Sequence, residues 1–263
     1  MIAIFAGSGH LPKEIFSSLH LSKKKFIILN LSNKNYKNSI KIKLGQFGKI
    51  IKILKNNKVK EVIFAGHVKR PRLEDMKLDL KAISYLPKLL NAFKRGDGNI
   101  LNLAKSILKE NKIKVIASHK YTKNLLLNKL ITKSKPNNID LKDYKKGSKI
   151  LKALSKFDNA QGVIVDNGYI LAIEAAEGTD EMLKRVIKLR SSKQKPSGVL
   201  IKLPKDKQSL NYDLPTIGLN TINLCAKLKL KGIFLKKNKN IFLNQKKSID
   251  LANKNNLFIS PMK

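Results

Sequence analysis

Short apolar runs alternate with amphipathic segments along the first half of the chain. The apolar runs have the length and β-rich composition of buried strands, and the segments between them repeat apolar residues every three or four positions, as helices do. The predicted strands are 1–7, 24–31, 59–68 and 114–118, and the predicted helices are 11–21, 47–57, 79–93 and 99–111. Pro87 lies inside the third helix and is expected to break or kink it.

The alternation changes near the middle of the chain. Residues 132–146 contain few apolar positions and carry Pro136, which is typical of a linker. We therefore predict an N-terminal domain over 1–131, a linker over 132–146 and a C-terminal domain over 147–263. Strands alternating with helices predict an α/β fold, and in the N-terminal domain a Rossmann-like, mostly parallel sheet covered on both faces.

A hairpin distinguishes the second domain from the first. Two β-rich runs within 162–176 flank Asp166-Asn167-Gly168, and Asn-Gly tolerates the positive φ angles of a tight turn. The remaining predicted elements are helices at 148–157, 180–189 and 219–230, a strand at 198–203 and two short strands within 231–243. This pattern predicts an α/β domain with a mixed sheet.

The formal net charge of +37 suggests a nucleic-acid partner, but the residue types do not support one. The basic residues are 50 Lys and only five Arg, dispersed among many Asn and Ile, and Trp is absent. Arginine is the residue favoured for specific phosphate and base recognition, and stacking on bases needs aromatic side chains near basic ones. We expect no nucleic-acid function and a weak attraction to anionic membrane surfaces.

Other composition features limit the class of protein. The single cysteine, Cys225, excludes an internal disulfide and lies on an apolar helix face, which predicts a buried thiol. No apolar run approaches the ~20 residues needed to cross a bilayer, and the N-terminus resembles a strand rather than a signal peptide. We expect a cytoplasmic protein. The four histidines have no spacing suited to zinc.

Two glycine turns follow predicted strands in the first domain. Gly7-Ser8-Gly9-His10 opens a helix, where backbone N–H groups could meet a phosphate or a nucleotide. A purely structural turn is the alternative. The third glycine of the dinucleotide fingerprint is missing and Asn30 stands where an acid should bind ribose, so we do not expect NAD.

The second glycine turn is Gly66-His67, at the rim where open α/β sheets bind ligands. Arg70 and Arg72 follow it and stand out from the lysine background, so phosphate contact is one interpretation and an exposed loop is the other.

Acidic residues gather in the second domain. Six of the 18 lie between Asp158 and Glu181. Helix capping by Thr179, and the favourable position of Asp180 and Glu181 at a helix start, give those three residues a structural explanation. That explanation leaves out Glu174 and Glu177, which suit a hard divalent cation such as Mg²⁺.

A further acid, Asp213, precedes a proline-fixed turn in DLPTIG. Restricting the backbone beside an acid holds the carboxylate in place, as a catalytic group requires. Capping the following helix is the competing role.

These stretches together resemble a known family. IFAGSGHLP, VIFAGHVKRP, NAQGVIV, ILAIEAAEGTDEMLKRV and DLPTIG occur in the same order in the UDP-2,3-diacylglucosamine pyrophosphatases of lipid A biosynthesis, of the two-domain LpxI type rather than the metallophosphoesterase type. The resemblance covers essentially the whole chain. It implies Mg²⁺-dependent hydrolysis of UDP-2,3-diacylglucosamine to UMP and 2,3-diacylglucosamine 1-phosphate by water attack on the α-phosphorus. A diacylated substrate implies peripheral contact with the inner membrane, and a homodimer is left open.

The resemblance also implies site residues. Asp213 is the implied catalytic acid and a metal ligand, joined in the metal site by the acids of the EAAEGTD segment, Glu174, Glu177 and Asp180. The implied substrate-binding residues are Gly9, His10, Gly66, His67, Arg70, Gln161, Thr179 and Lys202.

The chain departs from the family pattern just before the DLP turn, where Asp206, Ser209 and Asn211 replace a proline, an acid and an arginine. Lys202 or Lys205 is expected to supply the missing positive charge. The departures keep a non-catalytic nucleotide-sugar binding protein as an alternative, and a basic nucleic-acid-binding protein is a more remote one.

Overall fold

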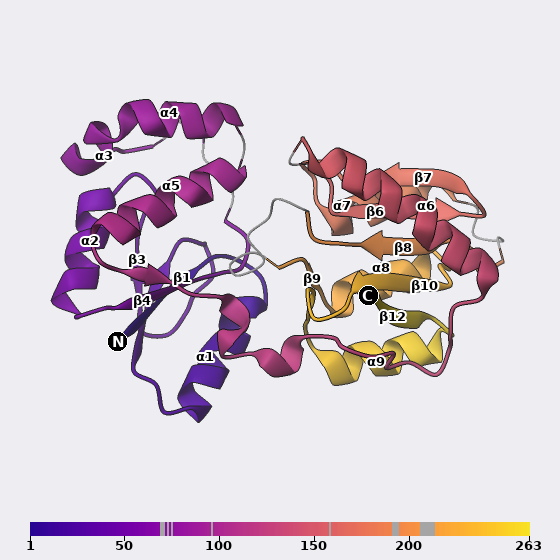
Figure 1. Cartoon of the computed structure of the whole chain (residues 1–263). Coiled ribbons are helices and arrows are strands. Elements are labelled where there is room, and N and C mark those ends of the chain that lie inside the picture. The colour runs from indigo at the N-terminus through magenta and orange to yellow at the C-terminus, as the bar shows by residue number, and fades with distance from the viewer. Residues whose placement is uncertain are drawn as a thin grey trace. The chain divides into compact units, whose positions relative to one another are not determined.

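The chain folds into two compact units, each described by itself (Figure 1). The first comprises Met1–Thr122, and the second begins at Lys123. The computed structural model describes residues 1–68, 72, 74, 76–95, 97–157, 159–190, 195–205 and 214–263, without the side chains of Arg95 and Asp97. Two residues of the predicted site, Arg70 and Asp213, therefore lie outside the described residues.

The first unit is built on a parallel sheet, as the sequence predicts. Its strands are β1 (Ile2–Ala6), β2 (Phe26–Asn30), β3 (Ser39–Lys41), β4 (Glu61–Ala65) and β5 (Lys114–Val115). They lie in the order β3-β2-β1-β4-β5, and each neighbouring pair is parallel. This is the order of the first five strands of a Rossmann fold, and the chain reverses direction across the sheet between β1 and β4. Ligands of open α/β sheets bind at the carboxyl ends of the strands at such a reversal.

Helices cover both faces of this sheet (Figure 1). They are α1 (Leu11–Leu21), α2 (Phe47–Asn56), α3 (Leu80–Ser84), α4 (Leu86–Arg95), α5 (Asp97–Glu110) and the 3₁₀ turn η1 (Ser118–Lys120). α1 packs Ile15 and Leu19 on one face, and α2 and α5 pack on the other. α3 and α4 are separate helices, because Pro87 cannot continue an uninterrupted helix, and this confirms the predicted break.

The second unit contains a mixed sheet, which confirms the second fold prediction. Its strands are β6 (Gly162–Asp166), β7 (Tyr169–Ile173), β8 (Val199–Lys202), β10 (Gly232–Lys236) and β12 (Phe258–Met262). They lie in the order β12-β10-β8-β6-β7, with β8, β10 and β12 parallel and β6 antiparallel to both β7 and β8. Asn167 and Gly168 form the predicted hairpin turn with φ angles of 49° and 82°.

Four α-helices of the described chain enclose the second sheet: α6 (Asn138–Ser155), α7 (Thr179–Leu189), α8 (Leu219–Lys227) and α9 (Gln245–Lys254), with a 3₁₀ turn η2 (Lys123–Leu125) near the start of the unit. α6 packs on one face together with Val163, Ile201 and Phe234. α7, α8 and α9 pack on the other.

One helix begins earlier than the sequence pattern suggests. Residues 138–146, which we assigned to the linker, form the first half of α6. Asn137 and Asp140 form a reciprocal capping box at its start, and Gly147 lies so close to the sheet that a Cβ there would be 2.8 Å from Cδ1 of Ile201. The many lysines on the solvent side of this helix make its few sheet-facing apolar residues difficult to detect in the sequence.

Several short elements were not predicted. They are β3, β9 (Thr216–Ile217), and the terminal α9 and β12. The two strands predicted within 231–243 exist as β10 and β11 (Ile241–Phe242), but they belong to different sheets, since β11 pairs with β9. None of the helices among the described residues is both long and apolar enough to span a membrane.

Cys225 lies in the middle of the second core, as predicted. Its side chain is fully buried on α8, and burial raises the pKa of the thiol well above its usual range. The thiol is therefore protonated and serves packing rather than nucleophilic chemistry.

Candidate functional site

The two glycine turns of the first unit meet at the carboxyl ends of β1 and β4, where the strand order reverses. The backbone N–H of Ser8 donates to the carbonyl of His67 (2.7 Å), and the N–H of His67 donates back to the carbonyl of Ser8 (3.0 Å). The N–H of Gly7 donates to the carbonyl of Ala65 (2.8 Å). Backbone pairing thus joins the two turns at the position where such a sheet binds its ligands.

The glycines permit this close approach. A Cβ at Gly7 would lie 2.4 Å from the carbonyl oxygen of His67, and one at Gly66 would lie 2.3 Å from that of Ser8. Gly66 also has a φ of 83°, which other residues rarely adopt. Gly7 and Gly66 are therefore explained by the contact between the turns. Gly9 differs, because its φ is 99° and a Cβ there would meet open space.

The exposed part of this edge is formed by Gly9, His10, Gly66 and His67. His10 is the residue before α1 and its side chain does not cap the helix. These four residues match the predicted substrate-binding positions and lie on one edge of one sheet.

Two buried polar residues, Tyr36 and Asn30, order the first glycine turn and the loop after β2. The Tyr36 hydroxyl donates to the carbonyl of Gly7 (2.6 Å), and burial raises the pKa of this phenol. Asn30, at the end of β2, is buried, and its Oδ1 accepts hydrogen bonds from the N–H and the hydroxyl of Ser32. Asn30 therefore orders its own loop, at the position that an acidic ribose ligand occupies in dinucleotide-binding proteins.

His119 was missed by the sequence analysis. It follows β5 in η1, and its Nδ1 is buried without a hydrogen-bond partner among the described residues. Burial lowers the pKa of this imidazole, so it is neutral at pH 7. Its environment therefore leaves one buried ring nitrogen of His119 without a partner in the described part of the chain, and loop histidines give no sequence signal that would single this one out.

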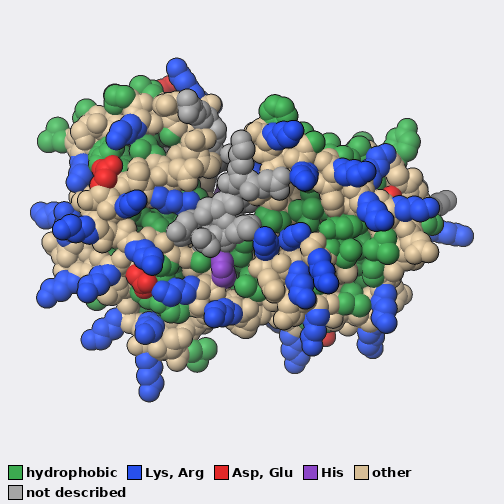
Figure 2. All heavy atoms as spheres, in the orientation of Figure 1, with side chains coloured by type: hydrophobic (Ala, Val, Ile, Leu, Met, Phe, Trp, Pro, Cys, Tyr) green, Lys and Arg blue, Asp and Glu red, His purple; other side chains and the backbone are tan. Residues whose placement is uncertain are grey.

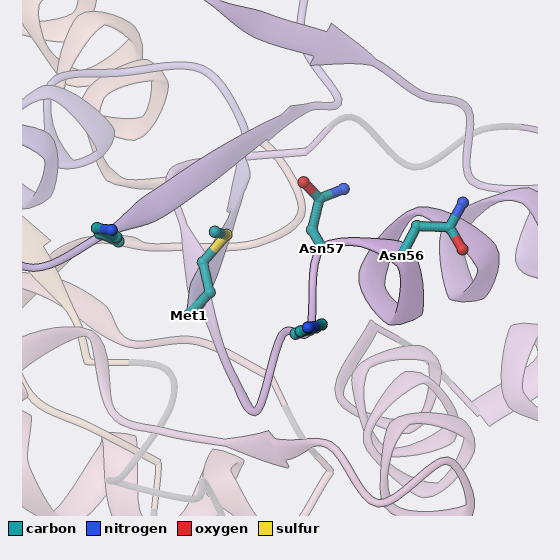
Figure 3. Close-up of a pocket in the computed structure, with 5 residues that line it drawn as sticks. Met1, Asn56 and Asn57 are labelled. Atoms are coloured by element: carbon teal, nitrogen blue, oxygen red, sulfur yellow. The ribbon is translucent and has the colours of Figure 1, made fainter.

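A hollow in the first unit lies at the opposite edge of the sheet (Figure 3). It has a volume of ≈ 410 Å³ and is lined by Met1, Lys25, Asn56, Asn57 and Lys58. These residues precede β1, β2 and β4, so the hollow faces the amino ends of the strands. Because ligands of this fold bind at the carboxyl ends, we do not assign it to the substrate.

In the second unit, the acidic segment is organised around Glu174 and Lys202. Glu174 directly follows β7, and Oε2 of its carboxylate lies 3.5 Å from the Lys202 ammonium, at the end of β8. Oε2 also accepts a hydrogen bond from the Thr179 hydroxyl (2.8 Å), and Lys202 donates to the same hydroxyl. The side chains of Lys202 and Glu174 are only 6% and 12% exposed, so this is a nearly buried ion pair.

This arrangement corrects one expectation and reinterprets another. Thr179 does not cap α7, because Gly178 is the residue before the helix and the Thr179 hydroxyl is engaged by Glu174 and Lys202. Lys202, expected to contact phosphate as a point charge, instead neutralises Glu174 in the described structure.

The Gln161-Gly162 turn is tied to the same cluster. A Cβ at Gly162 would lie 2.5 Å from Oε2 of Glu174, so a larger residue there would displace this carboxylate from its present position. The N–H of Glu174 donates to the carbonyl of Gly162 (2.9 Å), and the carbonyl of Gln161 accepts from Leu203 (2.9 Å). Two separate motifs of the sequence therefore meet at one cluster.

The other two acids of the segment have different partners. The Asp180 carboxylate accepts hydrogen bonds from Asn220 (2.6 Å) and from Thr221 (2.8 Å), which fixes the first turn of α7 against α8. Glu177 pairs with Arg185 across 2.9 Å, and both side chains are partly exposed. Glu174, Glu177 and Asp180 thus lie on one short segment, but each contacts a different group.

The described part of the chain contains no three His, Cys, Asp or Glu side chains arranged to hold a metal ion. Mg²⁺ needs only one or two carboxylates and takes its other ligands from water and phosphate. Glu177 and Asp180 fit that role better than Glu174, since a carboxylate oxygen can accept more than one partner and Glu177 is 31% exposed, whereas the carboxylate of Glu174 is nearly buried against an ammonium.

The sequence does not identify the partner of each acid, although the rare arginines give a weak indication. Only five arginines occur in the chain, and two of them pair with acids: Arg185 with Glu177, and Arg190 with Asp166 at 2.6 Å. In a lysine-rich sequence, a rare arginine is a sign of a specific contact.

Comparison with known proteins agrees with the architecture. Residues 1–125 match the model of the LpxI N-terminal domain, and residues 128–260 match that of the LpxI C-terminal domain. The chain is 32% identical over 243 residues to the UDP-2,3-diacylglucosamine pyrophosphatase LpxI of Caulobacter vibrioides, an alignment that covers 88% of this chain and 86% of that protein. These matches span both units, and the chain belongs to the LpxI family.

Proposed function

We propose that this protein hydrolyses UDP-2,3-diacylglucosamine to UMP and 2,3-diacylglucosamine 1-phosphate in lipid A biosynthesis. The observation that carries the proposal is the match of both halves of the chain to the two LpxI domains, together with the activity named for its relative. The glycine turns and the acidic segment that carried the resemblance are ordered parts of the two units.

In the proposed reaction, water attacks the α-phosphorus, and the bond from that phosphorus to the bridging oxygen breaks. The oxygen from water stays with UMP, and the bridging oxygen leaves with the sugar phosphate. Asp213 would orient the water or bind the cation. Gly9, His10, Gly66, His67 and Gln161 would contact the substrate, as Arg70 would, and Lys202 with Thr179 would hold Glu174 in place.

The reaction is proposed to require Mg²⁺, held by Asp213 together with Glu177 and Asp180. Bound there, the ion would neutralise charge on the diphosphate. Glu174 is the weakest candidate of the four proposed ligands, because its carboxylate is nearly buried as well as paired with Lys202. We place the reaction at the cytoplasmic face of the inner membrane, where a diacylated substrate resides.

A direct assay tests the proposal. Purified full-length protein is incubated with UDP-2,3-diacylglucosamine in ¹⁸O-labelled water, with Mg²⁺ or with a chelator, and the products are identified by mass. We expect UMP that carries one ¹⁸O atom, and loss of turnover with the chelator. Label in the sugar phosphate instead would contradict attack at the α-phosphorus. No UMP from folded protein would contradict the enzyme proposal and favour a nucleotide-sugar binding protein.

Asp213→Ala tests the catalytic residue. We expect it to reduce turnover at least about 100-fold, a loss comparable with that of an important catalytic group. Asp250→Ala is the matched control, because Asp250 is an exposed carboxylate on α9. Equal turnover in the Asp213 variant and the wild type would remove Asp213 from the mechanism.

A further inference from the structure

The outer face of α3 and α4 exposes three large aliphatic side chains. Leu80 is 87% exposed, Ile83 is 50% exposed and Leu90 is 41% exposed. Leu80 and Ile83 are three positions apart in α3 and therefore lie on the same side of the helix. Figure 2 shows hydrophobic side chains on the surface of the part of the first unit where Figure 1 shows α3 and α4. We call Leu80, Ile83 and Leu90 the α3–α4 patch.

This exposure is not the result of a poorly anchored helix pair. The Asp79 side chain caps α3 by accepting from the N–H of Ala82 (2.9 Å), and it also accepts from the N–H of Lys49 on α2 (3.2 Å). On the inner side, Ala82, Leu89 and Ala92 are buried, and Leu89 and Ala92 belong to the core of the unit. The inner face of α3 and α4 is therefore packed against the core, and the patch is a separate apolar surface on the solvent side.

Lysines border the patch. Lys77, Lys88 and Lys94 are exposed and lie within four residues of it in sequence, and Lys81 lies within α3 between Leu80 and Ile83. Two acids of this region are already engaged, since Asp79 caps the helix and Glu110 accepts a hydrogen bond from Tyr85. An aliphatic surface with a cationic border is complementary to a membrane interface. The aliphatic side chains can insert among the acyl chains, and the lysines can pair with anionic headgroups.

We infer that the α3–α4 patch docks this protein on an anionic phospholipid bilayer. The inference specifies the membrane contact proposed above and rests on that proposal for its biological purpose, although the surface itself is independent of the chemistry. Leu21 and Leu189 are also highly exposed, at 85% and 73%. Each ends its helix without a second exposed aliphatic residue on the adjacent turn, so these two leucines serve as controls.

Binding to vesicles tests the inference. The full-length protein is sedimented with vesicles of phosphatidylethanolamine and phosphatidylglycerol, at low salt and at about 1 M salt, where the Debye length is only about 3 Å. Because the chain carries a net charge of +37, low-salt binding alone would report charge from any surface. The binding that persists at high salt reports the apolar contact.

The double variant Leu80→Ser with Ile83→Ser is expected to lose at least about tenfold in high-salt partitioning, because two aliphatic side chains no longer enter the interface. Leu21→Ser and Leu189→Ser are expected to bind like the wild type. Wild-type partitioning of the double variant, or an equal loss in the controls, would overturn the inference. So would self-association of the wild type that the double variant abolishes without any vesicle binding, since a second copy would then cover the patch.

Turnover separates this inference from the proposed function. The double variant should release UMP normally from detergent-dispersed substrate and more slowly from substrate embedded in vesicles. Absence of UMP under both conditions for the wild type would contradict the enzyme proposal while leaving the vesicle result interpretable. An equal rate for the variant and the wild type on embedded substrate would contradict a role for the patch in substrate access.

Discussion

The two regions that carry the family motifs are held in place by different kinds of contact. The glycine turns of the first unit are joined by backbone hydrogen bonds, and no charged side chain takes part in the pairing of Ser8 with His67. The acidic segment of the second unit is positioned by side chains, with Lys202 on Glu174, Arg185 on Glu177, and Asn220 with Thr221 on Asp180.

The difference explains which residue types each region requires. Backbone pairing at close range needs the absence of a Cβ, so Gly7 and Gly66 are constrained by sterics. Side-chain pairing needs a complementary charge or donor. Glu174 therefore requires Lys202, because a nearly buried carboxylate without its cationic partner destabilises the fold. We therefore expect substitutions in the first region to destabilise the fold according to the size of the new side chain, and substitutions in the second according to its charge.

The largest expected effect is that of Lys202→Met. Removing the ammonium leaves the Glu174 carboxylate nearly buried without its cation, and breaking such a pair typically costs about 3–5 kcal/mol. We expect the free energy of unfolding at pH 7, measured by urea denaturation, to fall by about that amount. A loss below about 1 kcal/mol would show that solvent reaches Glu174 and that charge does not dominate this region.

Adding Glu174→Gln to Lys202→Met identifies the cause. The amide carries no charge, so the double variant should recover at least about 1 kcal/mol of the free energy of unfolding. A further loss in the double variant would mean that Lys202 contributes by packing rather than by neutralising Glu174.

Gly66→Ala tests the steric constraint in the first region, with Gly168→Ala as its matched control. The two glycines have nearly equal φ angles of 83° and 82°, but a Cβ at Gly66 would lie 2.3 Å from the Ser8 carbonyl, whereas one at Gly168 would meet open space. We expect Gly66→Ala to lower the free energy of unfolding by about 2–4 kcal/mol and Gly168→Ala by about 1 kcal/mol. Equal losses in the two variants would show that backbone angle, rather than contact between the turns, determines the need for glycine.

Local sequence patterns were sufficient for much of the fold. The alternating strands and helices, the break at Pro87 and the Asn167-Gly168 turn depend on residues close together in sequence, and the structure confirms all three. The start of α6 was obscured by lysines on its solvent side, and two-residue strands such as β9 are too short to give a periodic signal.

The candidate site was predictable only in part, for a similar physical reason. The acids of the EAAEGTD segment stand out in a chain with 18 acidic and 55 basic residues. Their partners do not, because Lys202 is 28 residues from Glu174 in sequence and Asn220 is 40 residues from Asp180. Which of many lysines reaches Glu174 depends on the order of strands in the sheet, and that order is a property of the folded chain.

Glu177→Gln is expected to have the smallest effect on stability. The Glu177 and Arg185 side chains are 31% and 51% exposed, and exposed pairs contribute only about 0.2–1 kcal/mol, which salt screens further. A hydrogen bond from its own backbone N–H, and then Arg185, lower the pKa of Glu177. The charged form is therefore favoured by folding, so its contribution is present above the ordinary glutamate pKa and is lost as pH falls through the lowered value. Urea denaturation at low and high salt measures the contribution.

If Glu177→Gln left stability unchanged but abolished UMP release or raised the Mg²⁺ requirement, the carboxylate would be held by Arg185 for the reaction rather than for the fold. If turnover were unchanged as well, Glu177 would be removed from the proposed cation ligands, and Asp180 and Asp213 would remain.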